Sequence, residues 1–79
     1  MRITVRYIGS GDRLYFTIYD LNGRPKANFS EPVTGKTIQK DIDVSTLTGG
    51  YYIMEVKDSK GTFRWTGKFL KAGDSGGSN

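Results

Sequence analysis

Apolar and polar residues alternate with a period of two along most of the chain. Between residues 2 and 7 the apolar positions are Ile3, Val5 and Tyr7, with arginine or threonine between them. Because successive side chains of a β-strand point to opposite faces of its sheet, this spacing predicts a half-buried strand. In residues 14–19, Leu14, Phe16 and Ile18 alternate with Tyr15, Thr17 and Tyr19, which predicts a second strand that is apolar on both faces. No stretch of about ten residues has the period of an amphipathic helix.

The dipeptide Asn22-Gly23 indicates a hairpin between two of these strands. A type I′ turn requires a positive φ at both central residues, which asparagine and glycine adopt more readily than other residues. We therefore predict a type I′ turn here, with the strand of residues 14–20 returning as a strand near residues 24–29. Pro25 places the returning strand at a sheet edge, because proline has no N–H to donate to a neighbour.

The second half of the chain contains further strand patterns. Residues 37–42 alternate and have one polar face, and Tyr52, Met54 and Val56 share one face of the following strand. The segment Asp58-Ser59-Lys60-Gly61 predicts a hairpin loop. The last strand is expected to carry Phe63, Trp65, Gly67 and Phe69 on one face and Arg64, Thr66, Lys68 and Leu70 on the other.

The segment 43–50 lies between two of these strands and lacks their alternation. Ser45 or Asp43 is placed to cap a single helical turn, with Leu47 pointing inward. Gly49 and Gly50 then release the chain into the next strand, because glycine tolerates backbone conformations that other residues avoid.

Together these patterns predict an all-β fold, an antiparallel β-sandwich or small barrel of six or seven short strands in residues 1–71. A chain of 79 residues is long enough for one domain and not for two. Residues 72–79, rich in glycine and serine, are expected to form a flexible tail or an added linker. The residues expected to be buried together are Phe16, Ile42, Leu47, Tyr52, Met54, Val56 and Phe69.

The net charge of +4 adds little to this picture. The basic residues are scattered, apart from a concentration between Lys57 and Lys71, which we interpret as a solvated face. No apolar run approaches the roughly 18 residues of a transmembrane helix, and residues 1–9 lack the pattern of a signal peptide. For an exported protein, we therefore expect the export signal and the cargo domain to lie outside this chain, which would be an excised piece.

The residue types exclude most catalytic chemistry. The chain contains neither histidine nor cysteine, so it lacks the usual nucleophile–base pairs and zinc ligands. Asp41 and Asp43 are expected on a solvent-facing strand surface, and a calcium site formed by these two and Asp58 matches no known ligand loop. We therefore predict no catalytic residue, no metal site, no cofactor and no enzymatic activity.

The chain is rich in aromatic residues, with five tyrosines, four phenylalanines and one tryptophan. One interpretation is an exposed stacking platform for a sugar or a single-stranded nucleic acid. The other is a sandwich core with cross-strand aromatic pairs. Most of these residues alternate in phase with aliphatic ones, which favours the core, and nucleic acid is not the expected partner.

Three segments occur in an order that resembles a known family. The first is an apolar strand that runs into a hairpin, the second leads through two glycines into another apolar strand, and the third is a short lysine-flanked motif. The segments are Phe16-Thr17-Ile18-Tyr19-Asp20-Leu21-Asn22-Gly23-Arg24, the stretch from Ile42-Asp43-Val44-Ser45 to Glu55-Val56, and Gly67-Lys68-Phe69-Leu70-Lys71. Together they resemble the type A C-terminal sorting domain of cargo of the bacterial type IX secretion system, or Por secretion system.

This resemblance implies an immunoglobulin-like antiparallel β-sandwich at the C-terminus of a larger secreted protein. It implies a sorting signal that directs the cargo through the periplasm and across the outer membrane to the cell surface or medium. The implied partners are the outer-membrane secretion machinery and a sortase-like peptidase that removes the domain as the cargo is attached to surface lipopolysaccharide. By the same resemblance, the binding residues of the signal are Gly50, Tyr51, Tyr52, Lys68, Phe69, Leu70 and Lys71.

Two other functions fit parts of the same sequence. A structural or carbohydrate-binding module of an extracellular enzyme would expose aromatic residues on one flat face, with Trp65 and Tyr51 as candidates. A small basic β-barrel that binds nucleic acid would show an affinity that falls steeply with salt.

Overall fold

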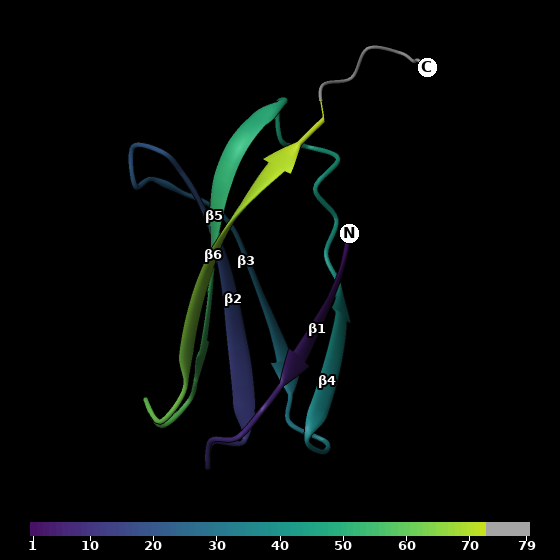
Figure 1. The fold of residues 1–79 in the computed structure, drawn as a ribbon, viewed down its shortest axis with the longest axis vertical. Coiled ribbons are helices and arrows are strands. Elements are labelled where there is room, and N and C mark those ends of the chain that lie inside the picture. The colour runs from purple at the N-terminus through teal and green to yellow at the C-terminus, as the bar shows by residue number, and fades with distance from the viewer. Residues whose placement is uncertain (73–79) are drawn as a thin grey trace.

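The computed structural model describes residues 1–72, and all its regular elements in that range are β-strands (Figure 1). The strands are β1 (Arg2–Arg6), β2 (Arg13–Asp20), β3 (Pro25–Pro32), β4 (Thr37–Asp41), β5 (Gly50–Asp58) and β6 (Arg64–Lys71). Within residues 1–72, no helix is long and apolar enough to cross a membrane.

The six strands form two antiparallel sheets that face each other. The larger sheet has the order β3-β2-β5-β6, and the smaller one pairs β1 with β4. Figure 1 shows the β1–β4 pair beside the larger sheet, with the strands of both running along the long axis of the molecule. This arrangement confirms the predicted all-β antiparallel sandwich, and β3 occupies the sheet edge that Pro25 indicated.

The core lies between the two sheets and is built from the apolar phase of the strands. Alternate residues of β2 and β5 point into it, and the smaller sheet contributes from the opposite side. Its buried members are Val5, Tyr7, Leu14, Phe16, Ile18, Ile38, Ile42, Leu47, Tyr52, Met54 and Val56. The ion pair between Lys40 Nζ in β4 and Glu31 Oε1 in β3, at 3.3 Å, also links the two sheets.

One residue of the predicted core, Phe69, is less buried than expected. Phe69 packs against the core but is only partly buried. The reason is its position in β6, the outermost strand of the larger sheet, where the smaller sheet covers one side incompletely. The other six residues of the predicted core are all buried.

The turn at Asn22-Gly23 is a hairpin, but the predicted type I′ geometry is wrong. Gly23 has a φ of 83°, whereas no residue other than glycine in residues 1–72 has a positive φ, so Asn22 does not. Gly23 N–H donates to the Asp20 carbonyl at 3.0 Å, and Asp20 N–H donates to the Arg24 carbonyl at 3.0 Å. The loop is therefore a three-residue connection that ends in a left-handed glycine, a common alternative to the two-residue turn.

Segment 43–50 contains a β-turn rather than the expected helical turn. Leu47 N–H donates to the Val44 carbonyl at 3.0 Å, and Ser45 N–H donates to Oδ1 of Asp43 at 2.9 Å. Asp43 thus caps the turn, and Leu47 is buried as predicted. Residues 73–79 of the expected tail lie outside the described residues, and the proposed domain limits stay a prediction.

Candidate functional site

The beginning of β5 and the end of β6 lie side by side (Figure 1). They form one antiparallel ladder in which Gly50 is opposite Lys71, Tyr51 opposite Leu70 and Tyr52 opposite Phe69. The next pair joins Ile53 to Lys68. The structure therefore brings together the residues that the resemblance singled out, which come from two motifs separated along the chain.

The inward side of this ladder fixes it to the core. The rings of Tyr52 and Phe69 stack with their centroids 5.8 Å apart and an interplanar angle of 28°. The Tyr52 hydroxyl also donates to the Thr48 carbonyl at 2.7 Å, so the buried tyrosine has a partner for its polar end. These contacts fix the ladder against segment 43–50.

The last residue of β6 makes a second connection to that segment. The ammonium of Lys71 donates to the Leu47 carbonyl at 3.2 Å. Gly50 begins β5 with a φ of 150°, a conformation that residues with a Cβ rarely adopt. The closing lysine and the opening glycine of the ladder therefore both have a local structural role.

The outward side of the ladder is exposed and has a different chemistry. Tyr51 and Leu70 are 51% and 61% exposed. The Lys68 ammonium lies 4.8 Å from the centroid of the Tyr51 ring, within the range of a cation–π contact. An exposed aromatic ring, an exposed aliphatic side chain and a cation at neighbouring positions are suited to binding another protein, and none of them is a nucleophile or a general base.

A hydrogen-bonded cluster at the other end of the sandwich was missed by the sequence analysis. Asp58 is only 5% exposed, and its carboxylate accepts hydrogen bonds from the Tyr7 hydroxyl at 2.6 Å and from the Thr62 N–H at 2.8 Å. The Thr62 hydroxyl also donates to it. Asp58 follows Tyr52, Met54 and Val56 in the same alternating phase, and this signal places its side chain on the inner face.

The electrostatics of the cluster favour the ionised carboxylate. Burial would raise the pKa of Asp58, but the hydrogen bonds from Thr62, Tyr7 and the Phe63 N–H outweigh it and hold the pKa well below its usual range. Burial, together with the bond to Asp58, raises the pKa of the Tyr7 phenol. A buried carboxylate satisfied in this way is a structural anchor.

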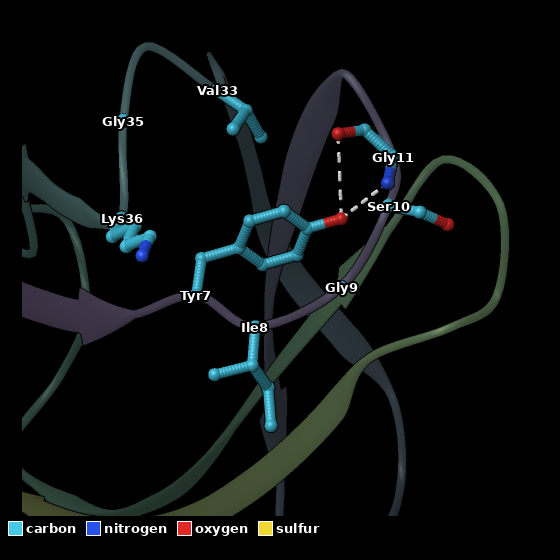
Figure 2. Close-up of a pocket in the computed structure, with 8 residues that line it drawn as sticks. All are labelled: Tyr7, Ile8, Gly9, Ser10, Gly11, Val33, Gly35 and Lys36. Carbon is cyan, nitrogen blue, oxygen red and sulfur yellow. Dashed lines mark hydrogen bonds between the residues drawn. The ribbon is translucent and has the colours of Figure 1, made fainter.

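A shallow hollow adjoins this cluster (Figure 2). Its volume is about 580 Å³, and it lies between the loop after β1 and the loop before β4. In Figure 2 the Tyr7 ring spans the space between these loops, and its hydroxyl is bonded to both backbone groups of Gly11. Three of its lining residues are glycines, and none of them is an aspartate, a glutamate, a histidine or a cysteine.

Two alternatives from the sequence can be compared with the geometry. Within residues 1–72, no group of three acidic residues is arranged to hold a metal ion, and Asp41 instead pairs with Arg2 at 2.9 Å. Trp65 is opposite the inward-facing Val56, whereas Tyr51 is on the outward face. The two aromatic residues suggested for a sugar-binding platform therefore point to opposite faces of the sheet.

Comparison with known proteins gives one match. A family model described as "Secretion system C-terminal sorting domain" matches residues 2–71, which is nearly the whole described chain. Neither a search of curated proteins nor a search of solved structures found a match. The matched range includes all six strands and the complete β5–β6 ladder.

Proposed function

The chain belongs to the secretion system C-terminal sorting domain family and is a sorting signal for type IX secretion. From this premise, we propose that the paired ends of β5 and β6 carry the part of the signal that the secretion machinery recognises. Sorting domains of this kind are not catalytic. We refer below to the residues Gly50, Tyr51, Tyr52, Lys68, Phe69, Leu70 and Lys71 as the ladder end.

The observation that carries this proposal is the register of β5 and β6. It makes a single surface from two motifs that the chain separates, with Tyr51 opposite Leu70. The inward side of the ladder end is used by the fold, through the Tyr52–Phe69 stack. The outward side has no such structural use, so Tyr51, Lys68 and Leu70 are the residues left for recognition.

Membership of the family implies interaction with the type IX secretion machinery and export to the cell surface or the medium. We propose in addition that the direct partner is the outer-membrane translocation machinery and that the domain passes through the periplasm on its way. We further propose that a sortase-like peptidase releases the domain after translocation. Cell fractionation, followed by sequencing of the N-terminus of the released domain, tests these finer steps.

A secretion assay with matched variants tests the proposed ladder end. The domain is fused behind a fluorescent periplasmic passenger in a host that has the secretion system. Tyr51→Ser combined with Leu70→Ser should leave most of the passenger in the periplasm, because both changes remove exposed recognition groups without touching the core. The purified double variant should unfold at nearly the same temperature as the original domain.

The chain provides a closely matched control pair. Tyr15 and Ile8 are 40% and 83% exposed, so both are accessible, as Tyr51 and Leu70 are. Tyr15 lies opposite Lys57 in β5 and Ile8 lies in the loop after β1, both away from the ladder end. Tyr15→Ser combined with Ile8→Ser should therefore export normally. Equal export of both double variants would show that the ladder end is not the recognised surface.

A further inference from the structure

An apolar groove runs between β1 and β6, which belong to different sheets. Ile3 and Trp65 line both parts of it, one of about 330 Å³ toward Phe63 and one of about 170 Å³ toward Phe69. The Trp65 ring lies against Gly67, which has no side chain to hold it away. The groove is therefore floored by aliphatic and aromatic groups that the two sheets leave incompletely covered.

Both strands that border the groove have an unpaired edge within residues 1–72. β1 pairs only with β4, and β6 pairs only with β5. An unpaired strand edge presents backbone N–H and C=O groups to which an extended segment can add. Together, the groove and the two unpaired edges provide a site at which one more strand can add.

The rim of the groove is cationic. Arg2, Arg6 and Lys68 line it, and none of its lining residues is acidic. Arg2 is paired with Asp41, but Arg6 and Lys68 form no ion pair with any residue in the range 1–72. Two cations without a carboxylate partner therefore flank an apolar floor.

The charge of β6 argues against a second copy of this chain as the occupant. The strand contains Arg64, Lys68 and Lys71 and no acidic residue. Antiparallel pairing of two β6 strands would bring like charges together across the new interface, which is destabilising. The partner strand should instead carry negative charge.

We propose that the groove between β1 and β6 binds an extended segment of a partner protein in which apolar and acidic residues alternate. Alternate side chains of a strand point to opposite faces, so one set fills the apolar floor while the other meets Arg6 and Lys68. This inference rests on the proposed function, since it names the partner chemistry at the β6 side of the ladder end. Binding in vitro and export in cells are measured separately, so either can fail without the other.

The single tryptophan of the chain provides the measurement, because Trp65 lies in the groove and is 48% exposed. The purified 79-residue chain is titrated with a capped peptide of alternating valine and glutamate, about as long as the eight residues of β6. The expected result is a saturable blue shift of the tryptophan emission that weakens in about 0.5 M salt, where charge pairs are screened. The comparison peptides replace glutamate by lysine, or group the same residues in two blocks so that the alternation is lost.

Charge reversal gives the matched variants. Lys68→Glu should weaken binding of the acidic peptide by at least about tenfold and allow the lysine peptide to bind. Lys60→Glu changes the net charge equally but lies in the β5–β6 hairpin loop, and it should leave the affinity unchanged. The proposal is overturned if the two variants behave alike, if the block peptide binds as well as the alternating one, or if emission shifts only with anionic lipid vesicles.

Discussion

The hydroxyl of Tyr7 donates a 2.6 Å hydrogen bond to Oδ2 of Asp58, a residue 51 positions further along the chain. Tyr7 follows β1 of the smaller sheet, and Asp58 ends β5 of the larger one. The bond therefore connects the two sheets at the end of the sandwich opposite the ladder end. The edge-to-face contact of Tyr7 with Phe63, at a centroid distance of 5.4 Å, reinforces the connection.

Tyr7→Phe should destabilise the domain, because it removes one donor from a buried carboxylate while keeping the ring. Tyr15→Phe is the matched control, since Tyr15 is 40% exposed. Urea denaturation of the two variants should show a lower midpoint for Tyr7→Phe and an unchanged one for Tyr15→Phe. Equal midpoints would mean that the hydrogen bond to Asp58 contributes nothing to stability.

The stability of the domain should fall in acid, and Asp58 should account for much of the fall. Because the pKa of Asp58 is lower in the folded than in the unfolded chain, its contribution is complete above the unfolded pKa of about 3.9. It is lost as the pH falls below that value toward the folded pKa. The pKa values of Asp20, Asp41 and Asp43 are lowered as well, in the same direction but at exposed or half-buried positions.

Asp58→Asn isolates that contribution. The variant should be less stable than the original domain near neutral pH, and the difference should shrink steadily as the pH is lowered. Urea midpoints measured at several pH values between neutral and strongly acidic provide the comparison. Parallel curves for the two proteins would assign the acid sensitivity to other carboxylates.

The alternation of residues was enough to predict the strands and most of the core. Leu14, Phe16 and Ile18 are fully buried in β2, and Tyr52, Met54 and Val56 are buried in β5, as their period indicated. The alternation could not predict that Phe69 is only partly buried. Burial at a sheet edge depends on how far the other sheet extends, and alternation within one strand carries no information about that.

Contacts between residues at the ends of different strands also could not be predicted from the sequence. The pairing of Tyr7 with Asp58 depends on which strands share a sheet and where their ends meet, and the period of each strand says nothing about either. The turn type at Gly23 depended on the Asp20 side chain, which accepts hydrogen bonds from the N–H groups of Asn22 and Arg24 at 2.9 Å each. These bonds favour the three-residue loop over the two-residue turn that Asn-Gly usually indicates.

Gly23→Val should destabilise the hairpin despite the corrected turn type. The φ of 83° is strained for a β-branched residue, although no atom lies within 4 Å of an added Cβ. The expected loss in the free energy of unfolding is roughly 1–3 kcal/mol. Gly35→Val is the control, since Gly35 also has open space around its Cα but no positive φ. Chemical denaturation that shows equal losses for both would contradict the backbone argument.

Leu47→Ala should cost roughly 2–5 kcal/mol of unfolding free energy, the range for removing a buried leucine side chain. Leu47 is only 8% exposed, and its carbonyl accepts the Lys71 hydrogen bond, so the turn and the ladder end should loosen together. Leu21→Ala, at a position 58% exposed, should have little effect on the same denaturation curve. A small loss for Leu47→Ala would show that segment 43–50 is not part of the cooperative core.

Truncation of the C-terminus should distinguish the residues that carry the signal from the last residues of the chain. Deleting Gly73 to Asn79 leaves every residue of the matched range 2–71 in place, so a fluorescent passenger fused to this form should still leave the cell. Deleting Lys68 to Asn79 removes the part of β6 opposite residues 50–53 and should trap the passenger in the periplasm.

Two controls accompany this assay. Thermal unfolding of both purified truncations shows whether the longer deletion acts through lost recognition or through lost folding. An authentic sorting domain exported in parallel confirms that the host is competent. If the full-length fusion stays periplasmic while that control is exported, the chain does not act as a sorting signal in that host, and affinity electrophoresis against polysaccharides becomes the next experiment.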